Sequence, residues 1–237
     1  MSSWASAPTR GYLRRHHVLQ GLLAWYVVLW VLLAIAPVDR RDWFLENLLA
    51  VSLLAILAAT YRWFPLSDLS YLLITVFLTL HAIGAHYTYA QVPLGFWMKD
   101  ALGLLRNHFD RIAHFAFGLL LTYPVGEVFR RITHLRGGWS YLVPITTVMA
   151  MSGLFEIVET WIAQLVSPEL GDAYLGAQGD IWDAQNDMTC ALAGTLLAAV
   201  TIALITRGRS AERWDEGRAR RPAAGQPPSR HPRVQAT

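Results

Sequence analysis

Six stretches of the chain are apolar over a length that can cross a lipid bilayer. The first, residues 18–36, holds no charged side chain, and about 20 apolar residues are enough for a transmembrane helix. The others cover about 43–60, 68–87, 108–129, 139–166 and 186–206. The pattern predicts an all-α membrane domain over 18–206, a polytopic bundle of six transmembrane helices that follows a polar N-terminal segment, 1–17.

The first stretch also resembles a signal peptide, because Ala34-Ile35-Ala36 has the form of a cleavage site. Its apolar run is longer than the roughly 7–15 residues of a signal core. Pro37 stands directly after the cleavage position, where it is unfavourable. We therefore interpret the stretch as a retained transmembrane helix.

Three connecting segments have patterns of their own. Between the third and fourth stretches, apolar residues recur at helical spacing opposite charged ones, which predicts a short amphipathic helix in the membrane interface. The apolar positions are Leu94, Trp97, Met98, Ala101, Leu102 and Leu105, and the charged ones are Lys99, Asp100 and Arg106. Residues 167–185 are rich in Gly and Asp and predict a loop. Residues 207–237 are rich in Arg, Pro and Ala, which predicts a disordered basic tail.

The composition agrees with a membrane protein. The chain is 54% hydrophobic and 16% charged, and a soluble domain has roughly 25% charged residues. Its 10 Trp residues are typical of aromatic belts at the two membrane interfaces. The net charge of +3 does not indicate nucleic-acid binding, because the Arg residues lie in loops and tails beside apolar runs. With Cys190 as the single cysteine, an intramolecular disulfide is excluded.

The basic residues predict an orientation in the membrane. They concentrate in the N-terminal segment, in the connections after the second and fourth stretches, and in the tail. The opposite connections hold fewer, and 167–185 has no Lys or Arg. The positive-inside rule therefore places both termini in the cytoplasm. Without the long tail the bias is weaker but has the same direction.

In this orientation, ionisable residues of four apolar stretches fall at one depth, in the outer leaflet. They are His81, His86, His108, Asp110, His114, Glu156, Glu159, Asp183 and Asp187. A charged residue at the centre of a membrane helix costs about 2.5–3.5 kcal/mol, so such residues predict a functional site. Glu46 and Glu127 are not assigned to this cluster, and a surface ion pair is expected for Glu127 beside Arg130 and Arg131.

Asp110 and His114 are four residues apart, which places them on one face of a helix. They are a pair of metal ligands, a carboxylate that orients a general base, or a hydrogen-bonded pair that only fixes helix packing. Glu156 and Glu159 are three residues apart and also share a face. Glu156 is expected to lie deeper, either protonated or paired with a cation or metal, whereas the alternative for Glu159 is contact with headgroup water.

Asp180, Asp183, Asn186 and Asp187 repeat at three- and four-residue spacing at the start of the last stretch. Helix capping accounts for one or two such residues, and this group exceeds that need. Carboxylate clusters suit Mg, Ca or Mn, and added histidine favours Mn, Fe or Zn, so a divalent metal ion of unassigned identity is a candidate cofactor. The candidate ligands are His86, Asp110, His114, Glu156, Glu159, Asp183 and Asp187, and the candidate catalytic residues are Asp110, His114, Glu156 and Asp183.

Several motifs together resemble the YjdF-type family of bacterial inner-membrane proteins, which has no assigned reaction. They are HYTYAQVPLGFW at 86–97, RNHFDRIAHFAFG at 106–118, E-x-x-E at 156–159 and LGAQGDIWDAQNDM at 175–188. The resemblance covers 18–206 and implies a multi-pass inner-membrane protein.

A more distant similarity is to VanZ-like membrane proteins. The matching residues are Asp110, Arg111, His114 and Phe115, then Glu156, then Asp183, Asn186 and Gly194. In that family a Gln usually follows the Glu, whereas this chain has Glu159. The similarity implies placement in the cell envelope and a shared polar site, without a defined reaction.

Three classes of function stay open. The first is an enzyme that acts in the outer leaflet on a lipid or lipid-linked envelope molecule, with a metal that activates water or polarises a phosphoryl or carbonyl oxygen. The sequence contains no H-E-x-x-H or G-x-S-x-G motif. The second is a proton-coupled transporter, which predicts polar residues on the cytoplasmic halves of the spans, where the sequence shows few. The third is a non-catalytic envelope scaffold or binding module, in which the polar cluster only stabilises the fold.

Overall fold

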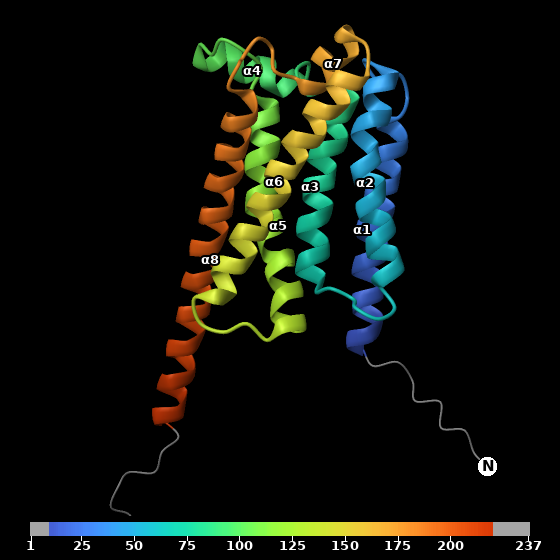
Figure 1. Cartoon of the computed structure of the whole chain (residues 1–237). Helices are drawn as coiled ribbons and strands as arrows, with labels where there is room; N and C mark the ends of the chain where they lie inside the picture. Colours follow the sequence, from blue (N-terminus) through green and yellow to red (C-terminus); the bar gives the residue numbers. More distant parts are fainter. Residues whose placement is uncertain (1–9, 220–237) are drawn as a thin grey trace, which may run out of the picture. The chain divides into compact units, whose positions relative to one another are not determined.

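The computed structural model describes residues 10–219, with side chains described for 17–207. Its described part contains eight helices and no strand, which confirms the all-α prediction (Figure 1). The helices are α1 Arg10–Leu33, α2 Arg40–Thr60, α3 Asp68–His86, α4 Pro93–Leu102, α5 Phe109–Thr133, α6 Trp139–Leu165, α7 Pro168–Leu175 and α8 Asp183–Ala219. The described residues divide into two compact units between Val200 and Thr201, and the site described below lies in the first.

Five of the described helices are long and apolar enough to cross a membrane: α2, α3, α5, α6 and the part of α8 over Asp183–Arg207. The apolar part of α1, His17–Leu33, is shorter. Five of the six predicted stretches therefore meet the requirement for a span. Large apolar side chains on these helices, such as Leu48 and Leu154, are more than half exposed, as expected where helices face hydrocarbon.

The segment 167–185, predicted as a loop, contains the short helix α7. Ser167 caps this helix by accepting a hydrogen bond from the Leu170 N–H at 3.4 Å, and Pro168 stands in the first turn. Gly176 follows the helix with a φ of 62°, a left-handed conformation that ends it. These are ordinary start and stop signals, and the prediction of a loop was wrong over Pro168–Leu175 because Gly and Asp dominate the composition around them, whereas 176–182 is not helical.

Helix α8 begins at Asp183 and continues through Ala219, past the predicted end of the last stretch at 206. It therefore includes 207–219, which the composition predicts to be disordered. Arg, Glu and Ala in this segment favour a helix even without apolar periodicity. The rest of the predicted tail, 220–237, lies outside the described residues.

Helix α3 packs against α1, α2 and α5, and α5 packs against α6. Helix α7 packs against α6 and α2 at the end of the bundle where α4 also lies (Figure 1). The predicted amphipathic helix is present as α4, and its location in the interface stays a prediction.

Helices α5 and α8 approach closely at two glycines. A Cβ added to Gly118 would lie 2.8 Å from the backbone N of Thr195, and one added to Gly194 would lie 2.8 Å from the backbone N of Leu119. Membrane helices commonly use small residues in this way to bring their backbones together. The contact fixes α5 against α8 below the polar residues at their N-terminal ends.

Glu127 of α5 joins a polar contact near the start of α3. Its carboxylate accepts hydrogen bonds from the Ser67 hydroxyl at 2.7 Å and the Ser70 hydroxyl at 2.6 Å. Arg131 Nη1 lies 3.1 Å from Glu127 Oε1. Glu127 thus pairs with an arginine as predicted, but it also anchors the N-terminus of α3, a role that the sequence did not indicate.

Candidate functional site

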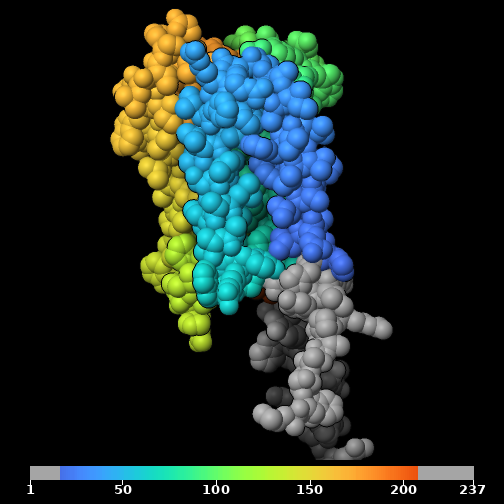
Figure 2. Space-filling model, turned by 90° about the vertical axis from the view of Figure 1, so that its right-hand side faces the viewer, coloured from blue at the N-terminus to red at the C-terminus, as the bar shows by residue number. Residues whose placement is uncertain are grey.

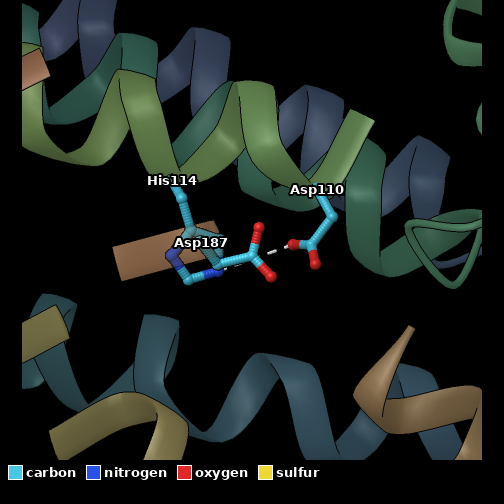
Figure 3. A group of neighbouring side chains, drawn as sticks. All are labelled: Asp110, His114 and Asp187. Carbon is cyan, nitrogen blue, oxygen red and sulfur yellow. Dashed lines mark ion pairs between the residues drawn. The ribbon is translucent and has the colours of Figure 1, made fainter. Parts of the chain in front are cut away.

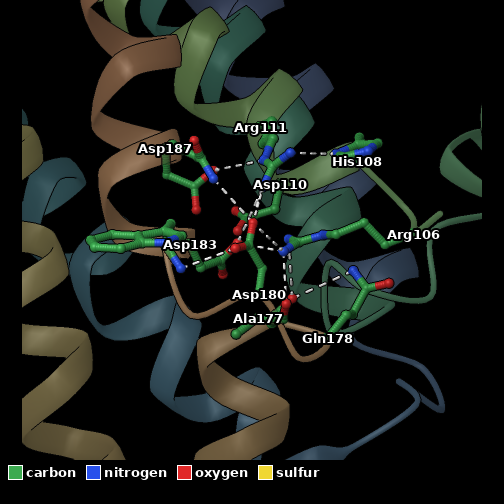
Figure 4. Close-up of polar contacts among 12 residues, drawn as sticks. Arg106, His108, Asp110, Arg111, Ala177, Gln178, Asp180, Asp183 and Asp187 are labelled. Carbon is green, nitrogen blue, oxygen red and sulfur yellow. Dashed lines mark hydrogen bonds and ion pairs between the residues drawn. The ribbon is translucent and has the colours of Figure 1, made fainter. Parts of the chain in front are cut away.

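Two arginines connect the segment before α8 to the start of α5 (Figure 4). Arg106 Nη1 lies 2.5 Å from Asp183 Oδ1 and donates a hydrogen bond to the Ala177 carbonyl at 2.7 Å. Arg111, in the first turn of α5, contacts the Asp180 carboxylate. Arg106 and Asp183 are both buried, and each neutralises the charge of the other, which would otherwise be desolvated and unpaired.

Asn107 forms a second connection between the same elements. Its N–H donates to Gln178 Oε1 at 3.1 Å, and Gln178 Nε2 donates back to the Asn107 carbonyl at 2.9 Å. The Asn107 side chain donates to the Val92 carbonyl at 2.9 Å and accepts from the Phe109 N–H at 3.0 Å. A Cβ on Gly95 would collide with this amide. The side chain of Asn107 therefore ties the starts of α4 and α5 together, and its backbone ties them to the segment before α8.

Asp110, His114 and Asp187 form a compact group between α5 and α8 (Figure 3). Each offers one ligand atom, and these three atoms lie within 4.8 Å of one another. His114 Nε2 is 3.6 Å from Asp110 Oδ1, in agreement with the predicted common helix face. Two carboxylates and one imidazole at this separation are a suitable donor set for a divalent cation.

Glu156 brings a third helix, α6, to this group. Its Oε1 lies 3.5 Å from His114 Nε2. Glu156 Oε1 and Asp187 Oδ1 are buried without a hydrogen-bond partner among the described protein groups, and so is the Ser152 hydroxyl. Buried polar atoms are normally paired, so these oxygens are suited to contact a proton, a cation or a substrate.

A cavity of about 370 Å³ adjoins the group. Its polar lining residues are Glu46, Ser52, His81, Tyr89, Asp110, His114, Ser152, Glu159 and Tyr174. Most of the other lining side chains are apolar, such as Leu53, Phe77 and Phe117, and belong to α2, α3, α5 and α6. An apolar pocket with a few convergent polar groups is the usual composition of a small-molecule site.

Carboxylates are in excess over basic groups in this part of the bundle. Those that are buried are Asp42, Glu46, Glu156, Glu159, Asp183 and Asp187. Among the described residues, the ion-pair partners of the site carboxylates are Arg106, Arg111 and His114. Buried negative charge is very costly, so the site requires bound protons or a cation in addition to the two arginines.

Two titratable groups lie just outside the spanning segments. Burial lowers the pKa of His108, and the neighbouring Arg111 and Arg106 lower it further. The Trp182 N–H donates to Asp180 at 3.0 Å and lowers the pKa of that carboxyl, with further contributions from Asn186 and Arg111. His108 is thus disposed to be neutral and Asp180 to be charged. His108 was predicted to belong to the cluster, and its contact there is with Arg111, whose Nη1 lies 3.2 Å from His108 Nδ1.

The structure brings most of the predicted site residues together. Asp110, His114, Glu156 and Asp187 lie in one group, and Glu159 lines the adjoining cavity. Asp183, predicted to be catalytic and a metal ligand, instead engages Arg106, which positions the segment before α8.

His86 does not join the group. Its Nδ1 lies 2.7 Å from the Leu33 carbonyl oxygen, and the residue does not line the cavity. Five residues separate it from His81, which rotates the two side chains by about 140° around the helix axis. His81 is the one that faces the cavity, so the prediction of His86 as a ligand of this group does not fit the structure.

Glu46 was left out of the predicted cluster, yet it is buried and lines the cavity. Its carbonyl oxygen lies 3.1 Å from His81 Nε2, and His81 Nδ1 lies 2.5 Å from the Tyr89 hydroxyl oxygen. The sequence did contain a signal for Glu46. It stands near the start of α2, at the same end of the bundle where α5 and α8 begin (Figure 1).

Long apolar helices around a buried polar site define an integral membrane protein. The family model described as "Predicted membrane protein (DUF2238)" matches residues 18–208, and the chain belongs to this family. The chain is also 37% identical over 166 residues to "Inner membrane protein YjdF" of Escherichia coli (strain K12), an alignment that covers 70% of this chain and 79% of that relative. These findings confirm the YjdF-type resemblance. No solved structure matches the chain significantly.

Proposed function

We propose that the protein is an inner-membrane enzyme that uses a divalent metal ion to act on a lipid or lipid-linked envelope molecule in the outer leaflet. The observation that carries this proposal is the group of Asp110, His114 and Asp187, with three ligand atoms within 4.8 Å of one another beside a largely apolar cavity. A metal at such a site activates water or polarises a phosphoryl or carbonyl oxygen. The apolar lining supports a substrate with a hydrocarbon part.

The residues of the site take distinct roles in this proposal. Asp110, His114 and Asp187 hold the ion, and their mixture of carboxylate and imidazole donors favours Mn, Fe or Zn. Glu156, with an unpartnered oxygen 3.5 Å from His114 Nε2, is the general base or a fourth ligand. Asp183 acts through Arg106 as a positioning residue.

The proposed topology has six spans, with α1 as the first, and both termini in the cytoplasm. Basic residues in the N-terminal segment and in the loops after α2 and α5 support this orientation. Helix α4 then lies in the outer interface, where the exposure of Leu94, Trp97 and Leu102 fits contact with lipid. The similarity to VanZ-like proteins agrees with a polar site on the envelope side.

A proton-coupled transporter is the second candidate, favoured by the buried contact of His81 with the Tyr89 hydroxyl beside Glu46. Transport also requires polar groups that lead to the other side of the membrane. Apart from the hydroxyls of Ser52 and Ser152, however, the rest of the cavity is lined by apolar residues such as Leu78 and Leu121, and no ionisable group lies among them. The enzyme therefore accounts for the cavity better than the transporter.

A purely structural cluster, as in an envelope scaffold or binding module, is the third candidate. Structural polar groups in a membrane protein are expected to pair with one another. Glu156 Oε1 and Asp187 Oδ1 accept no hydrogen bond among the described groups, and their ion pairs are long, at 3.5 Å to His114 and 4.0 Å to Arg111, which does not fit that expectation.

Metal analysis of the purified protein tests the proposal. We expect a stoichiometric divalent ion in the wild type and in Asp100→Asn, an exposed control on α4. His114→Ala and Asp187→Asn should lose the ion, together with hydrolysis of lipids from a bacterial envelope extract. A wild type without metal, whose thermal midpoint is unchanged by chelator, would remove the metal-dependent enzyme. Proton flux into proteoliposomes that disappears in Asp110→Asn would establish the transporter instead.

A further inference from the structure

The lining of the cavity changes from polar to apolar along the bundle. On α2 and α5, the ionisable lining residues lie toward the N-terminal end, as in Glu46 before Leu49 and Asp110 before Leu121. On α3 and α6 the order is reversed, as in Leu154 before Glu159. Since α2 and α5 begin at the end of the bundle where α3 and α6 finish (Figure 1), all four helices place their ionisable lining residues at one end. The hydroxyl side chains of Ser52 and Ser152 lie among the apolar lining residues. This arrangement fits a molecule with a polar group and a hydrocarbon chain.

Apolar residues of two helices line the cavity and are also exposed at the surface. They are Leu49 and Ile56 of α2, with exposed fractions of 45% and 61%, and Met151 and Leu154 of α6, with 44% and 58%. A side chain does both only at the edge of a cavity, so the opening lies between α2 and α6. Figure 2 shows α2 next to the segment of α6 and α7 on this face of the molecule.

The polar end of the cavity is closed where α7 covers it. Tyr174 is buried there, and Gly176 lines the same end. Behind them, Arg106 donates to the carbonyls of Gly176 at 3.4 Å and Ala177 at 2.7 Å. A ligand that came from this end would have to displace the arginine network. A ligand that comes from the bilayer meets mainly apolar side chains, and the exposed Ser52 hydroxyl there is already hydrogen-bonded to the Leu48 carbonyl.

We propose that the hydrocarbon chain of a membrane lipid enters the cavity sideways, between α2 and α6, and so brings the polar group of the lipid to Asp110 and His114. This assignment rests on the proposed function and names the substrate class of the same site. A chain that moves from the bilayer into an apolar cavity is never exposed to water, so its transfer carries no hydrophobic cost.

The dimensions of the cavity agree with this occupant. Glu46 and Ile56 lie about 15 Å apart along α2, at about 1.5 Å per residue. The volume of about 370 Å³ falls within the range of about 300–1,000 Å³ found for small-molecule sites. The cavity therefore accommodates part of one chain, with the remainder of the lipid in the bilayer at the opening.

Photo-crosslinking of the full chain in lipid nanodiscs tests the assignment. The probe is phosphatidylethanolamine with a diazirine near the end of one acyl chain, and mass spectrometry maps the labelled positions. We expect labels at Leu78 and Leu121, which line the cavity and are buried from the surrounding lipid. Labels confined to outward-facing positions such as Leu48 and Ile157 would overturn the assignment.

Substitutions at the opening make the test specific. Ile56→Trp combined with Leu154→Trp fills the opening and should reduce labelling of Leu121 roughly tenfold, equivalent to about 1.4 kcal/mol of binding free energy. The matched control, Leu48→Trp with Ile157→Trp, changes exposed residues of the same helices outside the lining and should retain the labels. Equal labelling in both double variants would refute lateral entry.

The role of the metal is tested separately. His114→Ala should lose the metal and keep the label at Leu121, because the chain contacts the apolar lining. A wild type that takes up the label without binding metal supports the lipid site and contradicts the proposed enzyme. A wild type that binds metal without internal labelling contradicts the lipid site alone.

Discussion

Replacing Arg106 with glutamine removes the cation that neutralises Asp183. In the folded protein, Arg106 Nη1 lies 2.5 Å from Asp183 Oδ1, 2.7 Å from the Ala177 carbonyl and 3.6 Å from Asp180 Oδ2. The side chains of Arg106 and Asp183 are only 9% and 10% exposed, so solvent cannot replace the lost charge. Breaking one side of a buried ion pair costs about 3–5 kcal/mol, and we expect Arg106→Gln to lower the free energy of unfolding by that amount.

Equilibrium unfolding in mixed detergent micelles, followed by circular dichroism, measures this loss. Arg131→Gln is the matched control, because Arg131 also pairs with a carboxylate but is 38% exposed. An exposed pair contributes about 0–1 kcal/mol. The double variant Arg106→Gln with Asp183→Asn removes both charges and should regain part of the stability lost in the single variant.

Two results would refute this reasoning. If the free energy of unfolding of Arg106→Gln lies within about 1 kcal/mol of that of the wild type, the buried pair contributes no more than a surface pair. If the double variant loses as much unfolding free energy as Arg106→Gln and Asp183→Asn lose together, the charges of Arg106 and Asp183 are not coupled.

Gly118→Val should lower the unfolding free energy by about 1–3 kcal/mol or more, because its side chain would meet the backbone of α8. Gly21→Val, with no atom within 4 Å of the added Cβ, should leave the thermal midpoint nearly unchanged, and equal effects at the two glycines would contradict the α5–α8 contact. Hydrogen bonds from Trp182 and Asn186, together with Arg111, lower the pKa of Asp180 below its ordinary value of 3.8. Its carboxylate therefore stabilises the fold above that value, and the contribution is lost as the pH falls through the lowered pKa. Thermal midpoints between about pH 5 and pH 2.5 should fall more steeply in the wild type than in Asp180→Asn, and parallel curves would exclude this contribution.

The sequence predicted the features that depend on one helix at a time. Apolar stretches long enough to span a membrane located the principal helices, and the four-residue spacing of Asp110 and His114 placed both on one face. The charge bias of the loops then put the ends of different helices at the same depth. This argument predicted that Glu156 and Asp187 would lie near His114.

The depth of a residue in the membrane does not determine how its helix is rotated about its own axis, and therefore which face points into the site. His86 lies at the expected end of α3 but contacts the Leu33 carbonyl, because packing directs that face of α3 to the end of α1. Arg106 was expected on the polar face of the amphipathic helix and is instead buried against Asp183. Such contacts depend on the packing of several helices at once, which periodicity in one segment does not encode.

The glycine contact between α5 and α8 has a consequence for the proposed metal site. His114 stands one turn before Gly118 on α5, and Asp187 stands two turns before Gly194 on α8, so the close backbone approach sets the separation of the donors on the two helices. Protein ligands lie about 2.0–2.1 Å from Mg²⁺ and about 2.3–2.6 Å from Ca²⁺. Where two helices pack backbone against backbone, their spacing cannot easily change by the few tenths of an ångström that separate these distances. Flexible side chains at the contact would permit such a change. In the proposed metal site, the choice of ion would therefore depend partly on Gly118 and Gly194, two residues outside the group of donors.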